Sequence, residues 1–121
     1  APVLSLHTTG DGAGTIADDA AYRSTVTAAG FARQLRQTFV ASEGHCTFTP
    51  AEEAAALTAL FDRIETGRWQ PTSPRQLDRL ATRVDADSDL DLGAARFTSG
   101  EAPGQPARMW DVQNWDDYRA K

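Results

Sequence analysis

A histidine and an aspartate occupy positions from which side chains commonly carry out acid–base chemistry. His45 lies within residues 42–50, after an apolar segment and just before a helix start, and Asp11 lies between two glycines after another apolar segment. A histidine whose ring is oriented by a carboxylate can remove a proton from a reacting group and later return it. The two residues therefore predict a general base, His45, and its orienting acid, Asp11.

The elements around this pair predict a parallel sheet. Residues 3–7 are nearly continuously apolar, which is typical of a strand buried on both faces of a parallel sheet. The mixed pattern of residues 35–41 predicts an outer strand. A helix is expected over residues 17–29, because Tyr22 and Val26 fall on one face and Gly30 follows. Three glycines among residues 10–15 indicate a turn with positive φ angles that presents Asp11 at the carboxyl edge of the sheet.

The segment after His45 carries the signals of a helix over residues 50–66. Thr49 and Glu52 form a capping box, and Gly67 is a natural stop. Gly44 allows a sharp turn beside the histidine. The large apolar residues of the helix fall on one stripe that is predicted to face the core: Leu57, Leu60, Phe61 and Ile64.

The order strand, acid, helix, strand, histidine, helix resembles the C-terminal third of an α/β-hydrolase, where the chain order is nucleophile, acid, histidine. Residues 2–69 resemble the end of secreted actinobacterial members through four pieces, "LSLHTTGDG", "LRQTFV", "GHCTFTPAE" and "TGRW". The resemblance implies the C-terminal part of a doubly wound, mostly parallel α/β sheet. Residues 1–69 would form that core, and residues 70–121 a C-terminal extension packed on the core or on a partner chain.

The same resemblance implies a serine hydrolase that cleaves carboxylic esters, with amides and lactones also known as substrates. His45 would take the proton of the serine hydroxyl, and Asp11 would fix the tautomer of its ring. No G-x-S-x-G occurs in the 121 residues, and the nearest match, residues 40–44, lacks the first glycine. The serine and the oxyanion hole are therefore expected on a missing N-terminal chain. No cofactor is expected.

The length and net charge of the chain indicate what kind of partner it could have. A chain of 121 residues could form one domain, but an α/β-hydrolase domain needs roughly 200–300 residues. The net charge of −5 argues against nucleic acid or an anionic membrane as the main partner. No apolar run is long enough to span a membrane. Ala1 in place of methionine, directly before an apolar strand, predicts the cut end of a longer, secreted precursor.

Other residues are weaker candidates for catalytic roles. Asp18 and Asp19 are rival acids, but they lie on a helix and not at a strand end. His7 is expected to be a packing or supporting residue. The single cysteine, Cys46, could be a nucleophile, but its side chain should point away from that of its neighbour His45. In a secreted protein an unpaired thiol suggests a bridge to another chain.

No metal is expected. The two histidines are not spaced as H-x-x-x-H, and no cysteine cluster is present to bind zinc. Residues 85–91 alternate carboxylates like the start of an EF-hand loop. The sixth position is Leu90 instead of glycine and the twelfth is Arg96 instead of glutamate, so a solvated acidic loop is predicted.

The second half predicts a short helix from Pro74, with Leu77 on its buried side, and a short strand over residues 94–98. The aromatic residues 109–118 are expected to lie across the body of the protein. Two readings without catalysis also remain. One is a self-contained small α/β binding module, and the other is a regulatory or structural subunit that keeps the hydrolase fold.

Overall fold

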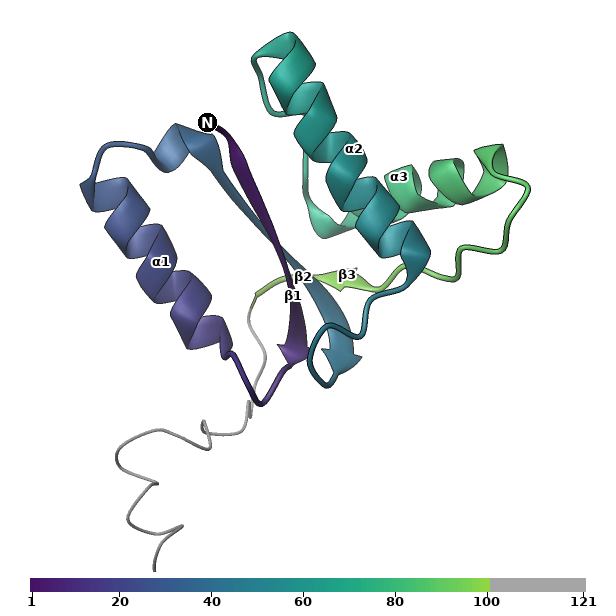
Figure 1. The fold of residues 1–121 in the computed structure, drawn as a ribbon, viewed down its shortest axis with the longest axis horizontal. Helices are drawn as coiled ribbons and strands as arrows, with labels where there is room; N and C mark the ends of the chain where they lie inside the picture. Colours follow the sequence, from purple (N-terminus) through teal and green to yellow (C-terminus); the bar gives the residue numbers. More distant parts are fainter. Residues whose placement is uncertain (101–121) are drawn as a thin grey trace, which may run out of the picture.

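The computed structural model describes residues 1–100, which form a mixed α/β fold. Within this range a small, mostly parallel sheet of three strands is flanked by three α-helices (Figure 1). Helix α1 lies on one side of the strands, and α2 and α3 lie on the other. The elements in chain order are β1 (Val3–Gly10), α1 (Ile16–Ala28), a short 3-10 helix (Ala32–Gln34), β2 (Leu35–Glu43), α2 (Pro50–Thr66), α3 (Pro74–Asp87) and β3 (Phe97–Thr98). The larger doubly wound sheet stays a prediction.

The strands are ordered β1-β2-β3 in the sheet. β1 and β2 run parallel, with a register that pairs Val3 with Leu35 and Thr8 with Val40. Parallel neighbours require a crossover connection, and α1 provides it. β3 pairs with β2 in the antiparallel direction. As a result, β1 and β2 both end at the same edge of the sheet, where the loops of Asp11 and His45 begin.

The predicted outer place of β2 is wrong, and the predicted burial of β1 on both faces is not seen within residues 1–100. β2, expected to be the outer strand, lies in the middle, and Leu35, Phe39 and Val40 are buried. β1, expected to be buried on both faces, has only Thr8 buried. The reason is that β3 covers the far side of β2, whereas β1 pairs with one strand only among residues 1–100.

The helix after His45 is confirmed with its predicted bounds. The Glu52 N–H donates to Thr49 Oγ1 at 3.3 Å, and the Thr49 N–H donates to Glu52 Oε2 at 2.8 Å, which is the reciprocal capping box. Gly67 ends the helix with φ 70°, a left-handed conformation that glycine adopts without steric cost. These signals are local, so the sequence alone defines both ends.

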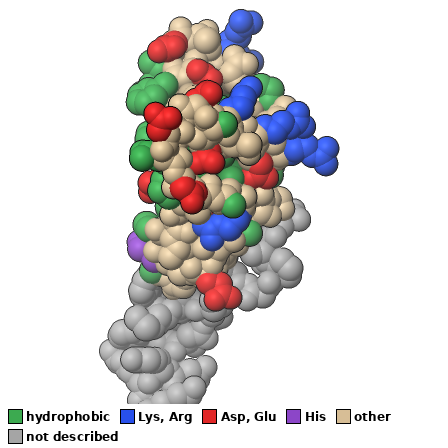
Figure 2. All heavy atoms as spheres, turned by 90° about the vertical axis from the view of Figure 1, so that its right-hand side faces the viewer, with side chains coloured by type: hydrophobic (Ala, Val, Ile, Leu, Met, Phe, Trp, Pro, Cys, Tyr) green, Lys and Arg blue, Asp and Glu red, His purple; other side chains and the backbone are tan. Residues whose placement is uncertain are grey.

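The buried face of α2 differs from the prediction. Its alanines Ala51, Ala55 and Ala59 face the core, while Leu57 and Phe61 are 53% and 56% exposed. Ile64 is similarly exposed. Figure 2 shows hydrophobic side chains at the surface of the side that α2 and α3 form. Small residues let helices approach closely, so α2 packs its alanine face in the core cluster formed by Val40, Ala51, Ala55, Ala59, Leu77, Ala81 and Phe97.

Helix α3 and strand β3 share that core with the preceding elements. Leu77 and Ala81 of α3 and Phe97 of β3 are buried in it. The predicted helix from Pro74 is confirmed. The division of the chain at residue 69 stays a prediction, and the aromatic residues 109–118 lie outside the described residues. Among the helices of residues 1–100, none is both long and apolar enough to cross a membrane.

A buried ion pair ties β3 to the start of α2. The Arg96 guanidinium donates to both carboxylate oxygens of Glu52 at 3.0 Å, and its backbone N–H donates at 2.8 Å. Glu52 is fully buried, whereas the Arg96 side chain is 38% exposed. Burial raises the pKa of Glu52, but the hydrogen bonds from Arg96 and Thr49 outweigh burial and hold this pKa below its ordinary value of 4.5.

Replacement of Arg96 by alanine is expected to lower the free energy of unfolding by about 3 kcal/mol. This is the low end for breaking a buried pair, because the guanidinium is partly exposed. A carboxyl with a lowered pKa stabilises the fold above its unfolded pKa, and the contribution is lost as pH falls through the folded pKa. The difference between wild type and Arg96→Ala should therefore be full near pH 7 and shrink below pH 4.5.

Urea denaturation of the wild-type and Arg96→Ala proteins at pH 7 and pH 4 measures this difference. Arg79→Ala, which removes an exposed arginine from α3, is the matched control and should leave the denaturation midpoint unchanged. An Arg96→Ala protein with the wild-type midpoint at pH 7 would contradict the stabilising role of the pair.

Candidate active site

The candidate site lies where β1 and β2 end side by side. Between Thr8 and Gly10 the register shifts, so that β2 carries one more residue than β1 opposite it. Such bulges re-aim the strand and its following loop, and they are common beside active sites. Gly10 permits the close approach of the strands, because a Cβ there would lie 2.8 Å from the Glu43 Cα. The two loops are therefore brought together by the sheet itself.

Asp11 is buried in the turn that follows β1. Its Oδ1 accepts hydrogen bonds from the backbone N–H groups of Ala13 at 2.7 Å and Gly14 at 3.1 Å. Its side chain is only 5% exposed. Burial raises the pKa of Asp11, but the hydrogen bonds from His45, Ala13 and Gly14 outweigh it, and the net pKa lies below the ordinary value of 3.8. Asp11 is thus an ionised carboxylate at neutral pH.

His45 meets this carboxylate from the other loop. Its Nδ1 lies 2.6 Å from Asp11 Oδ2, although 34 residues separate the two in sequence. A carboxylate can only accept, so Nδ1 carries the hydrogen and Nε2 is left with a lone pair when the ring is neutral. The His45 side chain is 66% exposed. The ring therefore has one nitrogen fixed by the protein and the other open to a further group.

The loop that carries His45 is held by hydrogen bonds to its backbone. Thr8 Oγ1 donates to Gly44 O at 2.6 Å, and the Gly44 N–H donates to Gly10 O at 3.2 Å. Gly44 has φ 90°, a value that side chains disfavour. On the other side of the histidine, Arg96 donates to Thr47 O at 2.9 Å. The loop is therefore fixed on both sides of His45.

Arg96 is the supporting residue that sequence reasoning missed. It contacts Ser42 Oγ at 3.0 Å in addition to Thr47 O and Glu52, so it joins β3, the end of β2 and α2. Arg96 lies about fifty residues after the histidine loop, and the sequence placed it only in a predicted short strand and in a rejected calcium motif. No local pattern signals a contact across that separation.

The expected positive φ angles in the first loop are absent. Within the described residues, positive φ values among glycines occur at Gly30, Gly44, Gly67 and Gly93, none of which lies in the Asp11 turn. The turn is instead closed by the hydrogen bonds to Asp11 Oδ1. Of the glycines around the turn, Gly10 is required for close packing, whereas a Cβ at Gly12 would meet no atom within 4 Å.

The rival acids have other partners. Asp18 accepts from the Thr15 N–H at 2.8 Å and caps α1. Asp19 pairs with His7, and it also accepts from Gln37 at 3.2 Å. The structure thus brings Asp11, and neither of these residues, to within hydrogen-bond distance of His45.

Two further residues bear on nucleophile chemistry. Cys46 is an exposed free thiol with φ 53°. Ser42, in the nearest match to a nucleophile motif, shares a hydrogen bond with Thr47 Oγ1 at 2.8 Å and accepts from Arg96. Within residues 1–100 no hydrogen bond joins a serine to His45, and no three His, Cys, Asp or Glu residues are grouped to hold a metal ion. The described part of the chain thus brings a histidine onto a buried carboxylate, and no serine within it is hydrogen-bonded to that histidine.

Comparison with known proteins indicates a hydrolase relationship. The chain is 36% identical over 80 residues to an o-phthalyl amidase of Xanthobacter agilis, and an amidase is a hydrolase. The match covers 66% of this chain but only 18% of the amidase, so the chain spans less than a fifth of that relative's length. No family model matches the chain. No solved structure matches it.

Proposed function

We propose that this chain supplies the general base and the orienting acid of a serine hydrolase. The observation that carries the proposal is the contact of His45 Nδ1 with Asp11 Oδ2 at 2.6 Å, combined with a ring that is 66% exposed. In the triad arrangement the acid binds Nδ1–H, and Nε2 acts on the nucleophile. The exposure of the His45 ring supports this role, because it leaves Nε2 accessible to a serine outside this chain.

The chemistry proceeds in two halves. Nε2 of His45 takes the proton of a serine hydroxyl as the serine oxygen attacks the carbonyl carbon of the substrate. The same proton then passes from Nε2 to the leaving alcohol or amine as the bond to the carbonyl carbon breaks, which leaves an acyl-serine. Water then attacks the acyl-serine, with His45 again taking and returning the proton, and the carboxylic acid product is released. Asp11 remains ionised throughout and stabilises the positive ring.

The serine is proposed to lie on an N-terminal chain or portion outside these 121 residues. Three features support this placement. The matched relative is more than five times longer than the matched stretch. Leu57, Phe61 and Ile64 leave an apolar stripe of α2 exposed, and such stripes mark contact surfaces. β1 has one unpaired edge among the described residues, which could pair with a further strand.

A carboxylic ester is the proposed substrate class, and an amide is the second candidate because the matched relative is named an amidase. A matched pair of substrates with the same acyl group, one ester and one anilide, separates the two. The class with the higher kcat/KM is the one the site serves. An extracytoplasmic location and a bridge through Cys46 stay predictions.

Mass spectrometry of the native preparation tests the proposal. The protein is treated with a fluorophosphonate, which labels activated serines, and is measured intact and after denaturation and reduction. We expect the label on a G-x-S-x-G serine outside this chain, in a species that associates with it. An unlabelled, folded 13.1 kDa species alone would contradict the proposal and favour the small binding module.

The same reasoning predicts how the isolated chain behaves. The described residues leave one parallel strand edge unpaired and an apolar stripe exposed, so the chain is expected to aggregate or stay partly unfolded without its partner. Size-exclusion chromatography and thermal melting of the purified chain measure this. A monomer with a sharp two-state melt would contradict the need for a partner.

A further inference from the structure

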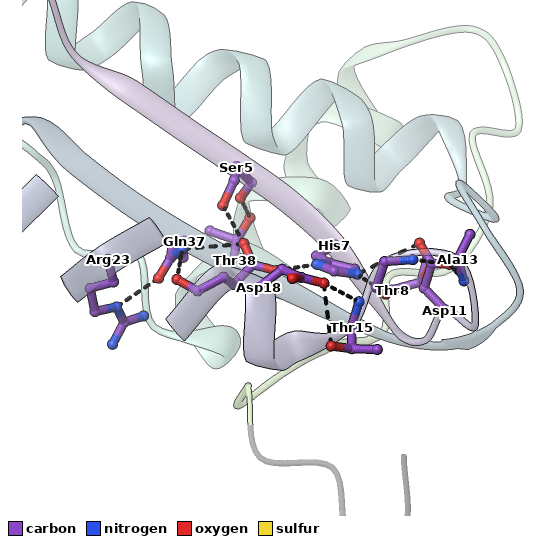
Figure 3. A network of polar contacts seen from close by, with 12 residues as sticks. Ser5, His7, Thr8, Asp11, Ala13, Thr15, Asp18, Arg23, Gln37 and Thr38 are labelled. Atoms are coloured by element: carbon purple, nitrogen blue, oxygen red, sulfur yellow. Dashed lines mark hydrogen bonds and ion pairs between the residues drawn. The ribbon is translucent and has the colours of Figure 1, made fainter. Parts of the chain in front are cut away.

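His7 lies between the Asp11 turn and helix α1, with only 13% of its side chain exposed. Its Nδ1 is in hydrogen-bond contact with Asp19 Oδ2, and its Nε2 lies 3.0 Å from Gly14 O. The same Nε2 is 3.6 Å from Asp11 Oδ2, the oxygen that binds His45. Figure 3 shows the His7 ring with Asp11 and Ala13 on one side and the start of α1 on the other. The ring thus connects the proposed acid to the helix.

The polar partners of His7 are all oxygen acceptors. They are the carboxylates of Asp19 on α1 and Asp11 in the turn, and the carbonyl of Gly14; from β2 the ring meets the apolar ring of Phe39, stacked at 6.4 Å. A neutral imidazole would direct a lone pair at one of these oxygens. Two N–H groups satisfy both nitrogens, so the hydrogen-bond pattern assigns His7 a hydrogen on each nitrogen.

Gly14 links His7 to the acid. Its carbonyl accepts from His7 Nε2, while its N–H donates to Asp11 Oδ1 at 3.1 Å. Asp19, at the other end of the ring, is itself fixed, because Gln37 of β2 donates to its carboxylate and to its backbone carbonyl. A chain of contacts therefore runs from the sheet through Asp19 and His7 to the turn that orients Asp11.

We propose that His7, with both ring nitrogens protonated, is a positioning residue that fixes the Asp11 turn so that Oδ2 faces His45. The proposal rests on the proposed function, since it concerns the acid of that site. Without the His7 side chain, the Asp11 carboxylate can shift away from Nδ1 of His45. Misplacement of a catalytic group by about 1 Å costs on the order of 10²-fold in rate.

Two variants of His7 test its positioning role through the kinetics of the assembled hydrolase. His7→Ala is expected to lower kcat by on the order of 10²-fold with KM changed less than about twofold, because the loss acts on the base and not on substrate binding. His7→Gln is expected to recover part of kcat, since its amide nitrogen can donate to Gly14 O. Ser24→Ala, an exposed change on α1, is the control and should have wild-type kinetics.

A second measurement is independent of turnover. NMR of the assembled protein, with ¹⁵N-histidine only in this chain, reports the hydrogens on both rings, and the chain contains two histidines. We expect two N–H groups on His7, and a hydrogen-bonded Nδ1–H of His45 that is lost in His7→Ala. If His7→Ala does not fold, the wild type and His7→Gln provide the same test.

The outcomes separate the two proposals. Either of two results would overturn the positioning role of His7. One is a His7 ring with a single N–H, and the other is a His7→Ala protein whose kcat is within about twofold of wild type. The proposed function fails if His45→Ala retains activity. The positioning of Asp11 by His7 still stands in that case if the Nδ1–H signal of His45, present in the wild type, is lost in His7→Ala.

Discussion

His45→Ala is expected to lower kcat of the assembled hydrolase by on the order of 10⁴-fold or more, as loss of a triad base does. Under the proposed function the serine then loses the group that accepts its proton, because the His45 ring, bound to Asp11 through Nδ1, is 66% exposed and leaves Nε2 open. KM should change little, since the effect falls on the chemical step. Stopped-flow or steady-state kinetics with an activated ester measure kcat and KM separately.

Chemical rescue sharpens this prediction. Added imidazole can occupy the space left by the missing ring and should raise the activity of His45→Ala in proportion to its concentration. Glu65→Gln, an exposed carboxylate change on α2, is the control for handling and charge. Activity of His45→Ala within about tenfold of wild type would show that His45 is not the base.

Asp11→Asn should lower kcat by roughly 10⁴-fold while the fold is kept. The asparagine oxygen can still accept from Ala13 and Gly14, so the turn remains closed. Its amide group, however, donates toward Nδ1 of His45 and moves the ring hydrogen to Nε2. A ring with the hydrogen on Nε2 cannot take the proton of the serine.

The pKa of Asp11 adds a pH dependence to this comparison. Hydrogen bonds hold the pKa of Asp11 below 3.8, so its carboxyl group stays ionised in mildly acidic buffer. The group becomes protonated only as the pH falls through this lowered pKa. Asp11 is therefore ionised at the neutral pH at which Asp11→Asn is compared with wild type. Glu53→Gln, on the exposed side of α2, serves as the matched acid-to-amide control. An Asp11→Asn enzyme with near wild-type kcat would remove Asp11 from the site.

The parts of the fold that depend on local signals could be predicted from the sequence. The bounds of α2 follow from the Thr49 and Glu52 capping box and from Gly67. The meeting of Asp11 and His45 was also predictable, because parallel strands end at one edge of a sheet and both residues follow such strands.

The parts that depend on distant contacts could not be predicted. The central place of β2 results from its pairing with β3, more than fifty residues later in the chain. The buried face of α2 is set by how closely its alanines approach α3, so the larger stripe at Leu57 and Phe61 was misassigned to the core. Arg96 reaches the histidine loop for the same long-range reason.

The crystal structure of the assembled protein after reaction with a fluorophosphonate tests the role of this chain most directly. We expect the labelled serine oxygen at about 2.6–3.2 Å from Nε2 of His45, with Nδ1 still bound to Asp11 Oδ2. A labelled serine that contacts a histidine of another chain, with the His45 ring facing solvent, would contradict the assignment of base and acid to this chain.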